Sequence, residues 1–403
     1  MFPMQTNRTR TIGRSFYALD RRPSGKTAQG WLLTIYSLRA RLKAWRRPRE
    51  REETMAEVNR IGMLTGGGDA PASNGVIRAV TMRCIEDYGY EVLGIKRGWK
   101  GLLSPEADSV QKLDVDDVRY ILEEGGTILM SSRTNPYKND GDAEKVVENM
   151  KEYGVDALVA IGGDDTLGVA KRLHDDFGVQ IVGCPKTIDN DLSATDTTFG
   201  YDTAVAIATE AIDRVRTTAR SHERVMIVEI MGRHAGWITW GAGVAGAANV
   251  TLIPEVEPDM DAIADLFEKR AERGEKWGVV AVSEGVTLSE DYITQSAETD
   301  EFGHVQLGGI GETLAGEIEE RTGINTRHVV LGHLQRGGTP TAYDRILSTR
   351  YGLRAAEAVK NGEWGQMVAL RGNEIVTVPL EEATEETKTV PDELYQAAAT
   401  FFG

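Results

Sequence analysis

The sequence predicts an α/β protein with parallel-rich sheets, and three observations support this class. Short apolar runs alternate with helical patterns along the 403 residues. Apolar residues make up 41% of the chain, which suffices for two buried cores, and no apolar run is long enough to predict a membrane span. Glycine- and aspartate-rich segments directly follow the apolar runs, as they do where ligands bind beyond the carboxyl ends of parallel strands. We therefore expect a binding site on the rim of an open parallel sheet.

The charge of the chain divides it into a basic leader and an acidic body. Residues 1–51 carry thirteen Arg or Lys and two acidic residues, whereas residues 52–403 carry 33 and 60. A body this acidic disfavours nucleic acid and bilayer surfaces as partners. We interpret residues 1–54 as a disordered leader or an upstream translation artefact, because Met55 precedes Gly66 by a natural first-strand length. A targeting segment, or an arm for oligomerisation or membrane contact, remains the alternative.

The first element of the body is the apolar run at 61–64, which predicts a strand. A glycine-rich turn, Thr65-Gly66-Gly67-Gly68-Asp69-Ala70-Pro71, follows it and leads into a helix predicted at 73–87. Consecutive glycines let backbone N–H groups approach a phosphate closely at a helix start. The turn is neither a Walker A loop nor a G-x-G-x-x-G fingerprint, so by itself it is a weak signal.

Two later apolar runs, at 157–161 and 180–184, predict neighbouring parallel strands joined by a helix at 166–176. Acidic clusters follow both runs. Such clusters usually form turns and helix caps, but two on adjacent strand ends favour a shared site. We therefore expect four carboxylates and one lysine at a single rim, a set suited to a metal-bound polyphosphate and an alcohol nucleophile; they are Asp164, Asp165, Asp189, Asp191 and Lys186.

The two cysteines, Cys84 and Cys184, lie in apolar patterns and lack any metal-ligand spacing. We expect reduced core thiols, which are typical of a cytoplasmic protein.

Seven motifs stand in the order typical of phosphofructokinases, and the chain from about Asn59 to about Ala369 resembles that family. The motifs are Gly66-Gly67-Gly68-Asp69-Ala70-Pro71, Gly125-Gly126-Thr127 with Ser131-Ser132-Arg133, Gly162-Gly163-Asp164, Thr187-Ile188-Asp189-Asn190-Asp191, Met231-Gly232-Arg233, Ser283-Glu284-Gly285 and Gly332-His333-Leu334-Gln335-Arg336-Gly337-Gly338. One departure is Ala72, where relatives usually have glycine.

The resemblance implies two similar Rossmann-like three-layer α/β domains with the active site in the cleft between them. On this pattern, residues 55–200 and about 335–385 form the phosphoryl-donor domain. Residues from about 201 to 334, together with 386–403, form the fructose 6-phosphate domain, and residues 1–54 stay outside both.

The resemblance also implies Mg²⁺-dependent phosphoryl transfer to the 1-hydroxyl of fructose 6-phosphate. Asp189 matches the family's proton acceptor, and Asp164 matches its magnesium carboxylate. Thr187 is expected to touch both the transferring phosphoryl group and the sugar, and Arg233 the reacting centre.

Further residues match the family's grip on the sugar phosphate. Guanidinium groups suit phosphate because they donate in pairs. The matching residues are Arg224, Arg327, Arg336 and His333 for the 6-phosphate, with Met231, Gly232, Arg233 and Glu284 along the sugar. In relatives, the counterparts of Arg224 and Arg327 come from the neighbouring subunit. The resemblance thus implies a homo-oligomer, a dimer or a tetramer, with shared sites.

Two positions resemble the pyrophosphate-dependent branch. ATP-dependent relatives have glycine where this chain has Asp165 and Lys186. A carboxylate at the first position fills the place of a nucleotide's α-phosphate, and a lysine at the second places a cation beside the transferred phosphoryl group. The expected donor ligands are Gly67, Gly68, Arg133, Lys138, Asp165 and Lys186.

We therefore expect reversible phosphoryl transfer from pyrophosphate to fructose 6-phosphate, giving fructose 1,6-bisphosphate. The alternatives are an ATP-dependent 6-phosphofructokinase that tolerates Asp165 and a catalytically silent subunit that binds sugar phosphate. NAD kinases and lipid kinases share Gly-Gly-Asp but lack the Met-Gly-Arg and Gly-His-x-Gln-Arg-Gly-Gly motifs.

Overall fold

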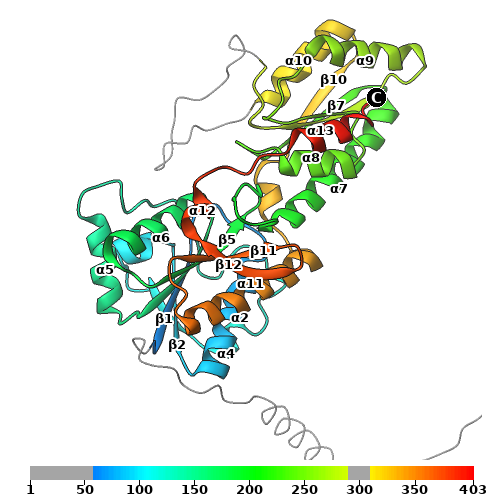
Figure 1. The fold of residues 1–403 in the computed structure, drawn as a ribbon. Coiled ribbons are helices and arrows are strands. Elements are labelled where there is room, and N and C mark those ends of the chain that lie inside the picture. The colour runs from blue at the N-terminus through cyan, green and yellow to red at the C-terminus, as the bar shows by residue number, and fades with distance from the viewer. Residues whose placement is uncertain (1–57, 289–308) are drawn as a thin grey trace, which may run out of the picture. The chain divides into compact units, whose positions relative to one another are not determined.

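The computed structural model describes residues 58–288 and 309–403, and residues 56–403 form one compact unit. The interpretations of residues 1–54 lie outside the described residues. Within the described ranges, the chain forms two separate sheets whose helices are shown in Figure 1.

The first sheet has eight strands, ordered β12-β11-β5-β4-β1-β2-β3, and β6 pairs with β5. Its inner strands are parallel, whereas β3 and β12 pair antiparallel at the two edges. The strands are β1 (Arg60–Thr65), β2 (Glu91–Ile95), β3 (Val110–Leu113), β4 (Ala157–Gly162), β5 (Ile181–Thr187), β6 (Phe199–Gly200), β11 (Gln366–Arg371) and β12 (Glu374–Pro379).

Helices cover both faces of this sheet, because alternate residues of each strand point to opposite sides. On β4, Val159 belongs to a core shared with α2 and α11, whereas Leu158 belongs to a second core. That second core takes its helical residues from α3, α5, α6 and α12. The helices are α2 (Ser73–Arg83), α3 (Lys100–Leu103), α4 (Val115–Val118), α5 (Asp142–Glu152), α6 (Asp164–Phe177), α11 (Ala342–Asn361) and α12 (Leu380–Thr384).

The second sheet has four parallel strands in the order β10-β7-β9-β8. Val228 on β7 packs in a core with α7 and α8, and its neighbour Ile227 packs in a core with α9 and α10. Both sheets are thus the middle of three layers, as predicted. The elements are β7 (Val225–Ile230), β8 (Val250–Leu252), β9 (Gly278–Ser283), β10 (Thr326–Val330), α7 (Tyr201–His222), α8 (Trp237–Ala245), α9 (Met260–Glu272) and α10 (Ile310–Thr322).

Helix α2 begins at Ser73, as predicted, but ends before its predicted span does. It stops at Arg83 and continues as a π-helical turn, Cys84–Tyr88, which Gly89 ends in the left-handed conformation. At its start, Ala72 has φ 68°. This conformation costs an alanine about 1–2 kcal/mol, which burial of the Ala72 methyl among the residues of the first core offsets in part.

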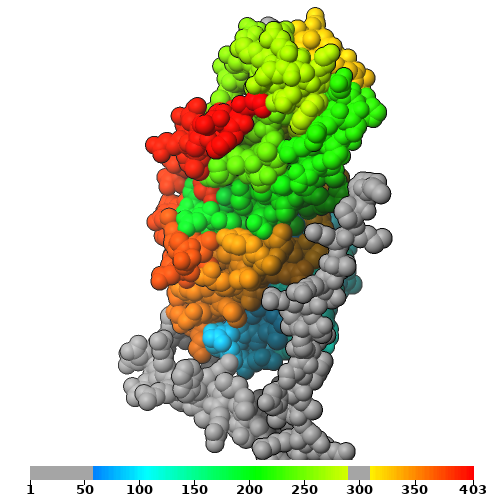
Figure 2. Space-filling model, turned by 90° about the vertical axis from the view of Figure 1, so that its right-hand side faces the viewer, coloured from blue at the N-terminus to red at the C-terminus, as the bar shows by residue number. Residues whose placement is uncertain are grey.

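A buried carboxylate connects elements of the two sheets. Asp344, fully buried near the start of α11, accepts hydrogen bonds from the backbone N–H of Gly200 (3.0 Å) and from both the N–H and the hydroxyl of Thr203 at the start of α7. At the other end of the chain, α13 (Asp392–Ala399) lies on atoms of the second sheet's layers (Figure 2), where Tyr395 donates to the Thr251 carbonyl.

Cys84 and Cys184 are buried free thiols, as predicted. Burial raises the pKa of Cys84 to about 12 and that of Cys184 further still. None of the described helices combines the length and the apolar character that a membrane crossing needs.

Candidate functional site

The glycine-rich turn after β1 lies against the end of β4 and the segment at 131–132. The Gly66 N–H donates to the Ile161 carbonyl (3.0 Å) and the Gly67 N–H to the Ser132 carbonyl (2.9 Å). Gly67 has φ 77°, and a Cβ on Gly68 would collide with the guanidinium of Arg336. Glycine is therefore required here for close approach by other groups.

Asp164 and Asp165 form the first turn of α6, where the helix dipole favours negative charge. Asp164 is exposed and Asp165 is half-buried. The charge of Asp164 is close enough to raise the pKa of Asp189 and Asp191 and to oppose the lowering of the pKa of Lys186. The structure therefore brings Asp164 together with the carboxylates of the next loop.

Strand β5 extends to Thr187, so Lys186 belongs to the strand end rather than to the loop that the apolar run at 180–184 implied. Its side chain is 3% exposed, and its ammonium donates to the Gly68 carbonyl. Burial, reinforced by the charge of Arg336, lowers the pKa of Lys186 to about 7. A buried lysine thus points from β5 to the glycine-rich turn.

The loop after β5 carries Asp189 and Asp191, both half-buried. Burial raises the pKa of both carboxyls, and the proximity of Asp164 raises them further. The Asp189 N–H donates to the Thr187 hydroxyl at 3.1 Å. Within the described residues, Asp189 Oδ1 is a buried oxygen without a hydrogen-bond partner. Such an acceptor is suited to a substrate hydroxyl.

The second sheet supplies the opposite side of this group of residues, from the carboxyl ends of β7 and β9. Met231, Gly232 and Arg233 follow β7, and Glu284 follows β9. Gly232 has φ 138°, and its N–H lies 3.5 Å from Glu284 Oε1. Burial raises the pKa of Glu284. The charges of Glu284 and Arg233 both act on the pKa of Asp189, which places these three groups close together.

Arg336 joins the same group from the 3₁₀ turn Gly332–Arg336. Its Nη1 donates to the Asp69 carbonyl at 3.1 Å, and its charge lowers the pKa of Lys186, Asp189 and Glu284. His333 is exposed on the same turn.

Arg224 and Arg327 lie at the other end of the second sheet. Arg224 immediately precedes β7, and Arg327 is the second residue of β10, paired with Met226. Arg327 is exposed and lies 3.4 Å from Glu319, whereas Arg224 Nε is buried without a hydrogen-bond partner among the described residues. The six residues of β7 separate these arginines from Gly232 by about 20 Å. One chain therefore does not bring them to Asp189.

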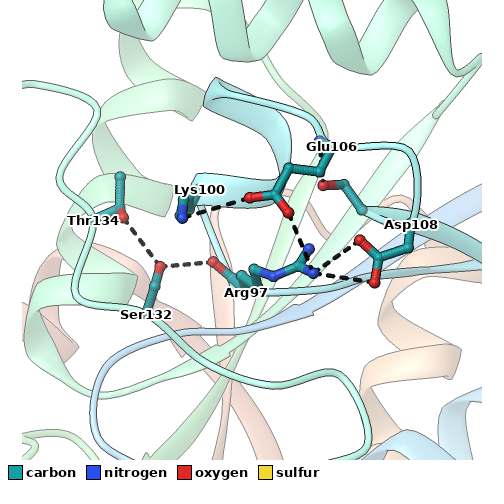
Figure 3. Close-up of polar contacts among 7 residues, drawn as sticks. Arg97, Lys100, Glu106, Asp108, Ser132 and Thr134 are labelled. Carbon is teal, nitrogen blue, oxygen red and sulfur yellow. Dashed lines mark hydrogen bonds and ion pairs between the residues drawn. The ribbon is translucent and has the colours of Figure 1, made fainter.

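Arg133 and Lys138, which the sequence predicts as donor ligands, are both exposed. The Arg133 charge reaches Lys186, whose pKa it lowers. A polar network holds the segment next to Arg133 (Figure 3): Ser132 Oγ donates to the Arg97 carbonyl at 2.6 Å and to Thr134 Oγ1 at 3.1 Å.

The same network fixes the Arg97 side chain. Its guanidinium forms two hydrogen bonds to Asp108, at 2.8 and 3.0 Å, and lies 3.6 Å from Glu106. Sequence reasoning missed the ion pairs of Arg97, because Arg97, Glu106 and Asp108 lie outside the recognised motifs.

Sequence reasoning also missed Lys388. This lysine lies in the segment between α12 and α13, and its ammonium bonds to the Asn190 side chain between Asp189 and Asp191. Its surroundings in the sequence, Glu-Glu-Thr-Lys-Thr-Val, contain no recognised motif that could have identified it.

Comparison with known proteins identifies the family of the chain. The family model for phosphofructokinase matches residues 60–359. A pyrophosphate–fructose 6-phosphate 1-phosphotransferase of Amycolatopsis methanolica is 57% identical over 85% of this chain and 100% of its own length. An ATP-dependent 6-phosphofructokinase of Streptomyces coelicolor is 49% identical over 84% of this chain and 98% of its own. The Pichia pastoris phosphofructokinase structure in the T-state has a TM-score of 0.71 and 30% identity, over 87% of this chain and 37% of that longer one.

Proposed function

The chain belongs to the phosphofructokinase family, and within that family we propose that it moves a phosphoryl group from pyrophosphate to fructose 6-phosphate. The product is fructose 1,6-bisphosphate, and the reaction is reversible. The observation that carries the donor assignment is Lys186, a buried ammonium at the glycine-rich turn, close to Asp164, whose neighbour in the first turn of α6 is Asp165.

The donor assignment follows from charge and volume. Pyrophosphate lacks the adenosine that anchors ATP, so the site needs another cation beside the transferred group, and Lys186 supplies it. Asp165 opposes a nucleotide's α-phosphate by its negative charge and its volume. Gly67, Gly68, Arg133 and Lys138 complete the donor side. The chain is similar both to a pyrophosphate-dependent and to an ATP-dependent relative, so overall identity alone does not assign the donor. The assignment therefore rests on Asp165 and Lys186.

In this proposal, Asp189 accepts the proton of the attacking hydroxyl. Its Oδ1 is buried and available to accept the proton of the sugar's 1-hydroxyl as that oxygen attacks the phosphoryl group. Arg233 and Lys186 offset the negative charge of the transferred group, while Thr187 lies between donor and sugar. Asp191 lies close to Asp189, and the charge of Asp189 raises the free-energy cost of ionising Asp191.

Family members generally need a divalent metal ion, and we propose Mg²⁺ with Asp164 as its carboxylate ligand. Asp164 is exposed at the start of α6 and electrostatically coupled to both loop carboxylates, which suits an ion that takes one or two carboxylates and otherwise phosphate oxygens. When bound, the ion would shield the charge of the pyrophosphate.

The two sheets divide the substrates. We propose that residues 55–200 with about 335–385 bind the donor and that residues 201–334 with 386–403 bind the sugar phosphate. His333, Met231, Gly232, Arg233 and Glu284 then belong to the sugar-phosphate side, and we propose that Arg336, at the boundary between the two sets of residues, also binds the sugar phosphate. The cytoplasm is the proposed compartment, because both cysteines are free and buried.

Arg224 and Arg327 make the proposed site depend on a second copy of the chain. They lie at the amino end of the second sheet, too far from Asp189 to reach it within one chain. Arg224 Nε, a buried donor without a hydrogen-bond partner among the described residues, suits a phosphate bound at a neighbouring subunit's site. Strand β10 is an edge strand among the described residues. Val330 at its carboxyl end is 50% exposed, and Leu334 in the following turn is 70% exposed. We therefore propose a homo-oligomer, a dimer or a tetramer, with active sites shared between subunits.

The donor assignment is tested by a coupled assay with fructose 6-phosphate, Mg²⁺ and either pyrophosphate or ATP. We expect turnover with pyrophosphate and far less with ATP. Preference for ATP would overturn the donor assignment, and inactivity with both would favour a catalytically silent subunit.

The shared site is tested by mixing protomers of Arg224→Ala with protomers of Asp189→Ser. Each variant alone has every site damaged, whereas a hybrid oligomer contains one site with both wild-type residues. Recovery of activity after subunit exchange, together with light scattering that gives a dimer or larger, supports the proposal. A fully active monomer would contradict it.

A further inference from the structure

Lys388 lies behind the loop that carries Asp189 and Asp191. Its ammonium donates to three oxygens: Asn190 Oδ1 at 2.9 Å, the Thr195 carbonyl at 2.9 Å and the Asp196 carbonyl at 3.1 Å. Three donors on the ammonium thus meet three acceptors, which is the full donor capacity of a lysine. The three oxygens form a cage for a small monovalent cation.

The cage contacts the loop at a buried residue in the left-handed conformation. Asn190 has φ 52°, a left-handed conformation, and its side chain is 3% exposed. Its Oδ1 accepts from the Thr198 N–H at 3.0 Å in addition to Lys388. Since Asn190 stands between Asp189 and Asp191, the position of its backbone sets the direction of both carboxylates.

The main chain at Thr387 and Lys388 also bonds to the loop and to the residue that follows it. The Lys388 N–H donates to the Asp191 carbonyl at 2.8 Å, and Leu192 forms a bridge with Thr387. On the other side, the Lys388 carbonyl accepts from Trp237 Nε1 at 2.8 Å, and its ammonium lies 5.6 Å from the centre of the Trp237 ring. Lys388 therefore connects the Asp189 loop with α8, which follows Arg233.

We propose that Lys388 is a positioning residue whose ammonium acts as a tethered monovalent cation, holding the Asp189–Asp191 loop in its working geometry. Lys388 contacts Asn190 and main-chain oxygens, so it acts on the reaction through the loop. The inference rests on the proposed role of Asp189 but not on the identity of the donor. One consequence is that the wild-type enzyme has no need of added K⁺ or NH₄⁺ at this cage.

The test is to remove the ammonium and offer a free cation in its place. Lys388→Ala should lower kcat by about 10²-fold, the effect expected of a small misplacement of a catalytic group, with KM for fructose 6-phosphate little changed. NH₄Cl, and to a lesser degree KCl, should then restore a large part of kcat at constant ionic strength, with choline chloride as the balancing salt. Choline is too large for a cage of three oxygens about 3 Å from a nitrogen.

Two further variants separate positioning from folding. Lys388→Met keeps an apolar stem in the cage, so its kcat should fall without recovery in NH₄Cl. Lys171→Ala removes an ammonium that pairs with Asp175 on α6, away from the loop, and its kcat should equal that of wild type in every salt. Circular dichroism and light scattering on all three check that fold and assembly are retained.

Turnover of Lys388→Ala at the wild-type rate would overturn the proposal. So would a loss that NH₄Cl relieves no better than choline chloride does, since Lys388 would then have only a structural role. Each assay uses whichever donor supports wild-type turnover, so an error in the donor assignment would appear in the wild-type enzyme and not in the cation response.

Discussion

The loops after β4 and β5 leave neighbouring parallel strands at the same edge of the first sheet, yet their charged groups have different environments. The loop after β4 leads directly into α6 and presents Asp164 to solvent. The strand end and loop after β5 bury Lys186 and half-bury Asp189, and burial shifts the pKa of each toward neutrality. The first loop thus offers an exposed carboxylate, whereas the second holds buried groups whose pKa values are shifted toward neutrality, as is common at catalytic sites.

The largest expected effect comes from substituting the proposed proton acceptor of the buried loop. Asp189→Ser should lower kcat by ~10²–10⁴-fold or more, because both general-base catalysis and positioning are lost. Binding of fructose 6-phosphate, measured by calorimetry, should stay close to wild type. Asp175→Ser, on the exposed side of α6, is the matched control. A variant that kept more than a small fraction of wild-type kcat would show that Asp189 is not the base.

Next in size is loss of the buried cation. Lys186→Met keeps the stem but removes the ammonium, and kcat with pyrophosphate should fall by ~10²-fold, as loss of one preorganised donor typically does. The affinity for pyrophosphate should change less, since Arg133 and the glycine-rich turn remain. Steady-state kinetics with pyrophosphate measures both quantities, and Lys171→Met is the matched control. An effect confined to KM would mean that Lys186 binds the donor without stabilising the transition state.

Asp165→Gly, in the first turn of α6, should change the preference between ATP and pyrophosphate rather than the rate of proton transfer. Turnover with ATP should rise from near zero to a measurable rate because the repulsion and the volume of the carboxylate are removed, and turnover with pyrophosphate should fall. The ratio of kcat/KM for the two donors is the measurement. Combined with Lys186→Met, the effects should be non-additive, because both side chains meet the same donor. An unchanged ratio would refute the role of Asp165.

The smallest effect is on the pH profile of kcat/KM, which reports the free enzyme. Asp189 must be ionised, and because burial raises its pKa, the acidic limb should lie above the ordinary carboxylate range. Lys186 must be protonated, and because burial lowers its pKa to about 7, activity should decline from there upward. Lys186→Arg should move the alkaline limb to higher pH, since a guanidinium stays protonated. An alkaline limb that does not move would assign it to another group.

Much of this contrast was predictable from local sequence. The apolar runs before Gly162 and Pro185 identified β4 and β5, and the rule for parallel sheets placed their acidic clusters at one edge. The burial of Lys186 was not predictable, because it depends on Arg336 and Gly68, which come from distant parts of the chain.

The second sheet shows the same limit. Arg224 and Arg233 are close in sequence. The extended backbone of β7 between them nevertheless places them at opposite ends of the second sheet. Lys388 had no local signal at all, since its role arises from where the chain returns after α12. Ala72 could be recognised as a departure, but its left-handed conformation became evident only in the structure.

The two buried thiols can report on local opening of the structure around them. Cys184 lies on β5 directly before Pro185 and Lys186, and Cys84 begins the π-helical turn after α2. Neither is reactive while buried, because the thiolate is the nucleophile and burial suppresses it. A thiol reagent added to the native enzyme therefore reacts only when these elements open. If substrates close the structure around Lys186, they should slow the modification of Cys184, so ligand binding can be followed by chemical labelling without an introduced probe.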